Sequence, residues 1–160
     1  MTASDEEAVR ARDAARRVLE SGAADEPVAE HAELRPVVVE TPERTPAGWL
    51  VGVVVGEKLA GFVQLDADLG FRRYASFARA AGLEGSPRAD DWLDRETVLA
   101  RARGKLRPGE TVADLHLGYH TSLDRVGWLV HTGGPGGEAR TLLVAGEDVS
   151  ELHADRREDA

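Results

Sequence analysis

The chain has 160 residues, of which 42% are hydrophobic and 31% charged, a composition typical of a globular protein with one ordinary or two very small domains rather than of a disordered chain. Its 29 acidic and 20 basic residues give a net charge of -9, which disfavours nucleic acid as a partner because the long-range field repels phosphate. There is no cysteine, so thiol catalysis, thiolate metal sites and disulfides are excluded.

The compartment is predicted from the N-terminus and from the apolar runs. The first seven residues include three acidic side chains and no basic one, and no apolar stretch follows them, so we expect no signal peptide. The longest strongly apolar run, residues 49–55, is too short to cross a bilayer. The basic residues are almost all arginine and there is no isoleucine, as GC-rich codons would give. We therefore predict a cytoplasmic bacterial protein without a membrane segment.

The first predicted element is an amphipathic helix over roughly residues 5–20. Ser4 and Glu7 form a capping-box pattern at its start, and Gly22 lies where it would stop. Its apolar residues recur at helical spacing: Ala11, Ala14, Ala15 and Val18, with Leu19 widening the stripe. Because this face is thin and rich in alanine, the helix must pack on something larger to be stable.

Four short β-rich segments follow the helix. They cover residues 36–41, 49–55, 59–66 and 71–77, separated by connections that contain Gly, Pro or Asp. Connections this short join neighbouring antiparallel strands, so the pattern predicts a four-strand meander.

The second half repeats this order of elements. Residues 79–93 have the Ala, Gly, Ser and Pro content of a linker. Asp94 is placed to cap a second helix, which Pro108-Gly109 would end. Strands are predicted at residues 112–119, 126–132, 139–145 and 148–152, and residues 154–160 as a frayed tail.

A short internal repeat supports two related units, residues 1–78 and 94–153. Gly48-Trp49-Leu50-Val51 recurs 79 residues later as Gly127-Trp128-Leu129-Val130, each time in the second predicted strand after a helix. The predicted fold class is therefore α+β, with two related helix-plus-antiparallel-β-meander units packed together.

The first unit resembles the PepSY-type domain, a small cystatin-like module of one helix and a meander. The residues that carry the resemblance are Gly48 to Val53 and the hairpin Val63-Gln64-Leu65-Asp66-Ala67-Asp68-Leu69-Gly70-Phe71. It covers residues 7–77 and, more loosely, residues 96–152. The resemblance implies a non-catalytic regulatory or inhibitory module, often tied to peptidases, with no catalytic residue to carry over.

Two groups of residues share features with metal or phosphate sites but lack the complete pattern. His116 and His120 are four apart, which on a strand separates them by roughly 13 Å, too far to share one ion, so we predict surface or rim histidines. The loop from Thr132 to Glu138 is rich in glycine but lacks the Lys and Ser/Thr of a phosphate loop, so we predict a hairpin loop. No cofactor and no metal is therefore expected.

The remaining candidates are carboxylates and a basic–aromatic cluster. Asp66 and Asp68, which we place near Glu57, are interpreted as turn residues rather than as an acid–base pair. Arg72, Arg73 and Tyr74 follow Phe71, and simple alternation would put Phe71, Arg73 and Phe77 on one face of a strand. Solvated arginines beside core aromatics are favoured over a platform for single-stranded nucleic acid.

From these observations we predict a non-catalytic cytoplasmic binding or regulatory module that engages a protein partner. An inhibitor or immunity-like role falls within that class, and a homodimer is left open. The acidic surface would suit a basic partner. The predicted partner-binding residues are Trp49, Trp128, Arg72, Arg73 and Tyr74, with the tryptophans contributing only where they are exposed. No catalytic residue is predicted. The alternative is a small-molecule-binding protein or small enzyme with a cone-shaped sheet of the nuclear-transport-factor type.

Overall fold

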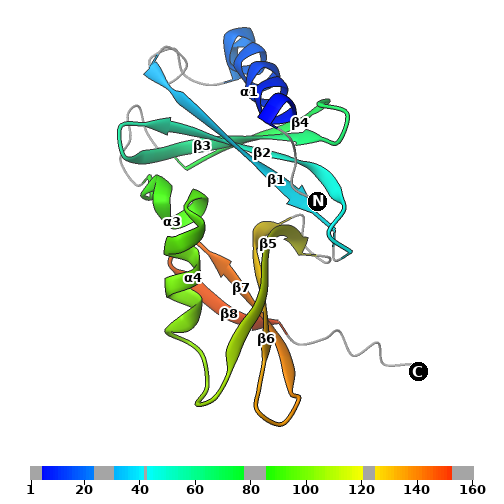
Figure 1. Ribbon diagram of the computed structural model, residues 1–160. Coiled ribbons are helices and arrows are strands. Elements are labelled where there is room, and N and C mark those ends of the chain that lie inside the picture. Colours follow the sequence, from blue (N-terminus) through cyan, green and yellow to red (C-terminus); the bar gives the residue numbers. More distant parts are fainter. Residues whose placement is uncertain (1–4, 24–30, 42, 78–85, 121–124, 153–160) are drawn as a thin grey trace, which may run out of the picture. The chain divides into compact units, whose positions relative to one another are not determined.

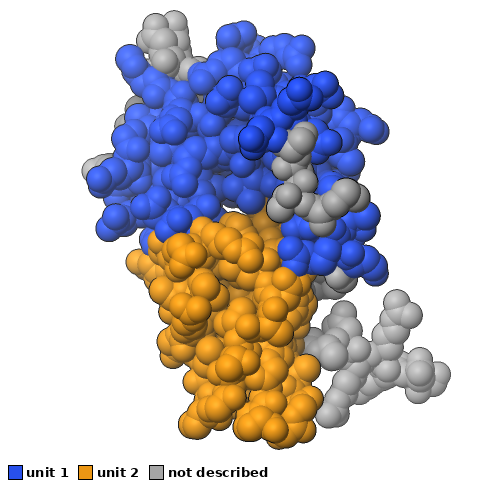
Figure 2. Space-filling view, viewed as in Figure 1, with its two compact units in different colours: residues 1–94 blue, residues 95–160 orange. Residues whose placement is uncertain are grey.

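The computed structural model describes residues 5–23, 31–41, 43–77, 86–120 and 125–152 of the chain (Figure 1). These residues divide into two compact units, residues 1–94 and residues 95–160 (Figure 2). Each unit contains helix and one four-stranded antiparallel sheet, so the predicted α+β fold of two similar units is confirmed. Because the described strands form two separate sheets, a single cone-shaped sheet running through the chain is not the architecture. No described helix has the length and apolar character needed to span a membrane.

Unit 1 begins with the predicted amphipathic helix and continues as a meander. Its elements are α1 (Asp5–Val18), the turn η1 (Leu19–Ala23), β1 (Glu33–Glu40), β2 (Pro46–Val55), β3 (Lys58–Asp66), β4 (Phe71–Ser76) and α3 (Ala89–Leu93). The strands are ordered β1-β2-β3-β4. Gly22 has a φ of 96°, which only glycine adopts readily, and the helical segment ends there as predicted. The predicted capping residue Ser4 lies outside the described residues.

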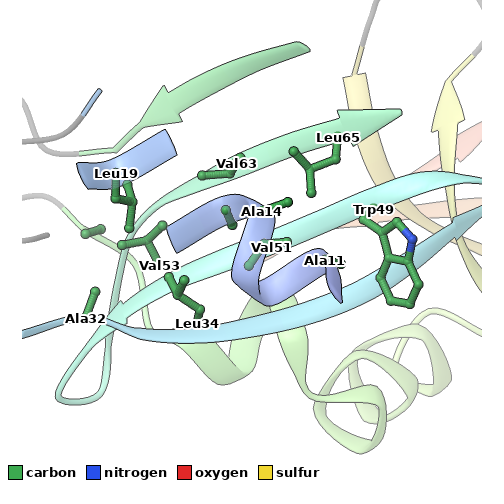
Figure 3. Packing of buried hydrophobic residues seen from close by; sticks show 12 residues of the cluster. Ala11, Ala14, Leu19, Ala32, Leu34, Trp49, Val51, Val53, Val63 and Leu65 are labelled. Carbon is green, nitrogen blue, oxygen red and sulfur yellow. The ribbon is translucent and has the colours of Figure 1, made fainter. Parts of the chain in front are cut away.

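The helix α1 packs on one face of this sheet and forms the main core of unit 1 (Figure 3). Small side chains let the helix approach closely, and Ala11 and Ala15 are completely buried. The cluster consists of Ala11, Ala14, Ala15, Leu19, Ala32, Leu34, Trp49, Val51, Val53, Ala60, Val63 and Leu65. Its β2 members are every second residue of that strand, as the two-residue period of a strand requires.

The helix α3, which the sequence patterns do not predict, packs against part of the other face of the sheet. Ala89 and Leu93 form a second core with Val54 and Leu59, and Trp92 lies against Phe62 and Phe77 with ring centroids 6.4 and 5.5 Å apart. The prediction of a linker is therefore wrong for residues 89–93, which belong to unit 1. Residues 79–85 of that predicted linker lie outside the described residues.

Unit 2 repeats the order of helix and meander. Its elements are α4 (Arg95–Arg103), β5 (Thr111–His120), β6 (Arg125–Gly133), β7 (Ala139–Ala145) and β8 (Asp148–Leu152), and the strands are ordered β5-β6-β7-β8. One face of the sheet presents two cross-strand rows, Leu115-Val130-Leu142 and Leu117-Trp128-Val144, and all six residues are buried. The opposite face carries His116 and Leu129. The predicted tail, residues 154–160, lies outside the described residues.

The repeated tetrapeptide occupies equivalent positions in the two units. Trp49 lies on β2 and Trp128 on β6, in each case the second strand of a meander that follows a helix. Both indoles are buried, with 6% and 5% exposure. The predicted match in element order is confirmed, while descent of the two units from one duplicated sequence stays a prediction.

Candidate functional site

The two repeat tryptophans do not lie on the surface. Trp49 pairs across the sheet with Val38 and Leu65, and Trp128 pairs with Leu117 and Val144. Each indole therefore lies on a central strand, between apolar side chains of the two flanking strands. A buried indole contributes to packing, and a partner cannot reach it without local unfolding. Trp49 and Trp128 are therefore removed from the predicted partner-binding residues.

The other three predicted partner-binding residues lie on β4, at the edge of the unit 1 sheet. Arg72 and Arg73 are exposed, and Arg73 Nε donates a hydrogen bond to Gln64 Oε1 at 2.8 Å. Tyr74 is half-buried and packs against the core beneath α1. Phe71, the first residue of the strand, is 53% exposed.

An irregularity in β4 corrects the predicted orientation of its side chains. The register of β3 with β4 shifts between Gln64 and Leu65, so Phe71 pairs with Leu65 while Arg73 pairs with Gln64. The extra residue is Arg72, and such a bulge reverses the alternation on either side of it. Phe71 therefore lies on the α1 side of the sheet, whereas Phe77 packs with Phe62 on the α3 side. The prediction of one shared face for Phe71, Arg73 and Phe77 is wrong.

The carboxylates near the β3–β4 turn serve the turn. Asp66 Oδ1 accepts hydrogen bonds from the backbone N–H groups of Asp68 (2.9 Å) and Gly70 (2.8 Å). This arrangement is the predicted turn chemistry. Glu57 precedes β3 and Asp66 ends it, nine residues later, which at about 3.3 Å per residue places them roughly 30 Å apart. The predicted proximity of Glu57 is therefore wrong, since the two carboxylates lie at opposite ends of the strand.

The glycine-rich segment from Thr132 to Glu138 forms the predicted hairpin loop between β6 and β7. The N–H of Gly134 donates to the carbonyl of Glu138 at 2.7 Å, and the N–H of Gly137 donates to the carbonyl of Gly134 at 3.1 Å. Gly137 has a φ of 80°, a conformation that favours glycine at this turn position. Two of the loop's backbone donors are thus used within it.

Unit 2 contains a partly buried ion pair that the sequence patterns do not predict. Arg140 on β7 binds Glu110 through two parallel hydrogen bonds, Nε to Oε2 at 2.7 Å and Nη2 to Oε1 at 2.6 Å. The hydroxyl of Thr132 donates to the same carboxylate at 2.8 Å, and the backbone N–H of Arg107 donates to it at 3.0 Å. These donors lower the pKa of Glu110 from 4.5 to about 2, with the Arg140 hydrogen bonds the largest cause. The pair ties the segment after α4 to the sheet.

This pair predicts a specific acid sensitivity. The pKa of Glu110 is depressed in the folded state, so its contribution to the free energy of unfolding is complete above the ordinary value of 4.5 and is lost as the pH falls toward 2. We expect the stability of the wild type to fall more steeply over that interval than the stability of Glu110→Gln. Urea unfolding followed by circular dichroism at a series of pH values measures both slopes.

The control for this experiment is Glu147→Gln, which changes an exposed carboxylate in the turn between β7 and β8. Its stability should follow the wild-type curve, and parallel curves for the wild type and Glu110→Gln would contradict the prediction.

A second group that the sequence patterns do not predict lies on the face of the unit 2 sheet opposite Trp128. Asp114 and His116 are two residues apart on β5, so they share a face, and His131 pairs with Asp114 across β5 and β6. The nearest ligand-type atoms of the three side chains all lie within 4.8 Å of one another. The imidazoles of His116 and His131 are stacked, with centroids 5.3 Å apart.

The structure corrects the prediction made for the histidines. β5 is a strand, as predicted, but His116 is only 1% exposed and is not a surface or rim residue. Its neighbour in space is His131, which is 15 residues away in the sequence, rather than His120. Residue spacing along β5 alone does not reveal this pair, because it is the pairing register of β5 with β6 that brings the two histidines together.

Comparison with known proteins gives no relative for this chain. No protein-family model, no curated protein and no solved structure matches it. The resemblance to the PepSY-type domain stays a prediction.

Proposed function

We propose that the chain is a non-catalytic binding or regulatory module that engages another protein through β4, the edge strand of unit 1. The observation that carries the proposal is Phe71, a large aromatic side chain that is 53% exposed on this edge. Aromatic side chains, phenylalanine included, and arginine are enriched at protein–protein interfaces, and Phe71 is followed directly by two arginines.

Because both faces of the unit 1 sheet carry a helix, we expect a partner to bind at an edge strand. Unit 1 has α1 on one face and α3 on the other, each with its own core. A partner that adds to such a sheet therefore approaches an edge strand, where one row of backbone donors and acceptors has no strand beside it. Among the described residues, β4 pairs with β3 alone.

The two edges of this sheet differ in a way that favours β4. β1 carries Pro36 in its middle, and proline cannot donate a hydrogen bond to an added strand. β4 carries no proline, and its exposed arginines offer a local positive charge. A partner segment that adds to β4 is therefore expected to be extended and acidic, with an apolar residue that contacts Phe71. The local charge of β4 is thus opposite in sign to the net charge of the chain, which favours a basic partner.

The proposal includes a cytoplasmic location and a role as an inhibitor or immunity-like factor. The absence of cysteine fits a reducing compartment. A peptidase or toxin as the partner would specify inhibition, whereas another class of partner would leave a regulatory adaptor.

The test is affinity capture of the tagged full chain from a lysate of its host, with three baits compared by mass spectrometry. We expect the wild type to retain a stoichiometric protein at moderate salt and Phe71→Ala to lose it. Val9→Ala is the matched control, because Val9 is the other large hydrophobic residue exposed in the described part of the chain, at 43% on α1. This variant should retain the partner.

Three outcomes would contradict the proposal. The wild-type bait could be recovered alone, or Phe71→Ala could retain the partner as well as Val9→Ala does. A wild-type dimer that Phe71→Ala converts to a monomer, measured by light scattering, would assign the edge to a second copy of this chain instead.

A further inference from the structure

The cluster of Asp114, His116 and His131 has the composition of a transition-metal site. Imidazole and carboxylate together suit zinc and its neighbours in the first transition series, whereas magnesium and calcium prefer oxygen ligands alone. Two imidazoles and one carboxylate, with a fourth position left for water, form a common three-ligand set for zinc.

The backbone holds the three side chains in place without a metal. Asp114 and His131 are cross-strand partners. A register shift between Val112 and Asp114 determines which residues of β5 pair with which residues of β6 at this point. His116 follows two residues later on the same face and stacks on His131. Positioning on two paired strands keeps the cost of organising the ligands small, because the backbone is already fixed.

The present spacing is close to that of a bound site. Bond lengths of 2.0–2.2 Å in a tetrahedron put ligand atoms about 3.3 Å apart. The ligand-type atoms here lie within 4.8 Å of one another, so side-chain rotation brings them to bonding distance without a change of strand register. Burial also helps, since His116 is 1% exposed and the other two residues are half-buried, which removes competing water.

A fourth residue orients one of the imidazoles. His131 Nδ1 lies 3.1 Å from Thr141 Oγ1 on β7. When Nδ1–H donates to this hydroxyl, the lone pair of the ring is on Nε2, the nitrogen left to bind a metal. A hydrogen bond from the second nitrogen of a ligating histidine is the usual way in which the tautomer is fixed.

From these observations we infer that unit 2 binds one divalent transition-metal ion of the zinc type through Asp114, His116 and His131, with Thr141 as a positioning residue. Three protein ligands leave a coordination position for water or for a side chain of a bound partner. The inference does not depend on the partner proposed above, since the site consists only of residues of unit 2 whereas β4 belongs to unit 1.

The test is a titration of the tag-free full chain, stripped of metal with a chelator, with Co²⁺ followed by visible absorption. A polyhistidine tag must be absent because it would bind Co²⁺ itself. We expect one equivalent of Co²⁺ with the intense d–d bands of a four- or five-coordinate ion, displaced by one equivalent of Zn²⁺. Asp114→Asn and His131→Ala should weaken binding more than about 100-fold, and Thr141→Val by about 10- to 100-fold.

His120→Ala is the matched control, since this histidine lies on the same strand about 13 Å from His116 by strand geometry and should leave the Co²⁺ affinity unchanged. Far-ultraviolet circular dichroism of each metal-free variant checks that it folds, and Thr141→Val tests the site without removing a ligand. The inference is overturned if the folded wild type takes up no stoichiometric Co²⁺ at micromolar concentration. Equal affinities of the wild type, Asp114→Asn and His131→Ala would overturn it as well.

Discussion

Replacing Trp49 by alanine is expected to lower the free energy of unfolding of unit 1 by about 3–5 kcal/mol, the range for a large aromatic side chain removed from a core. Trp49 is 6% exposed and belongs to the cluster beneath α1, with Leu34, Val51 and Leu65 among its members (Figure 3). The loss combines the transfer free energy of the indole with the cost of the cavity that it leaves. Because small domains have only about 5–15 kcal/mol of net stability, this one change should bring unit 1 near its unfolding midpoint.

The measurement is urea unfolding monitored by circular dichroism, since removing a tryptophan alters the fluorescence signal itself. Phe71→Ala is the control, because it removes an aromatic side chain of the same sheet that is 53% exposed. Its stability should change by no more than about 0.5 kcal/mol. A Trp49→Ala chain as stable as Phe71→Ala would show that the indole is not part of the core.

The second large effect concerns the contact between α3 and the sheet. Gly52 faces Leu93, and a Cβ added at Gly52 would lie 2.5 Å from Leu93 Cδ1 and 3.3 Å from Leu59 Cδ1. Gly52→Ala therefore overpacks this core and is expected to cost about 1–3 kcal/mol. Leu93→Ala removes a buried leucine side chain and is expected to cost about 2–5 kcal/mol.

The double variant distinguishes this contact from two independent effects. Leu93→Ala provides the space that the new methyl group needs, so the double variant should lose less stability than the sum of the two single losses, by about 0.5–3 kcal/mol. Gly133→Ala is the control for strand glycines, since a Cβ there would meet nothing within 4 Å. Additive losses in the double variant would contradict the packing of α3 on β2.

Local patterns in the sequence predict most of the described fold because the paired strands of each meander are consecutive in the sequence. Apolar runs bounded by Gly, Pro or Asp gave the eight strands, and consecutive strands joined by short turns can only pair in order. The helix α3 was missed for the opposite reason. Its five residues are too few to show a helical period, and what stabilises them is the packing of Leu93 on residues far away in the sequence.

The candidate sites were less predictable than the fold, because each depends on the register of two strands. Glu110 and Arg140 are 30 residues apart, and His116 meets His131 only through one particular pairing of β5 with β6. A single bulge at Arg72 was enough to move Phe71 to the other face of its sheet. Spacing within one strand contains no information about such pairings.

The position of α3 has a practical consequence for anyone who divides this chain. A fragment that ended at residue 78, where the sequence pattern alone would cut, would expose Val54 and Leu59 on the face that α3 covers. Such a fragment would present a fresh apolar surface to solvent and would be prone to aggregate. A fragment that contains the whole first unit therefore extends to Asp94, and the cut belongs in front of Arg95.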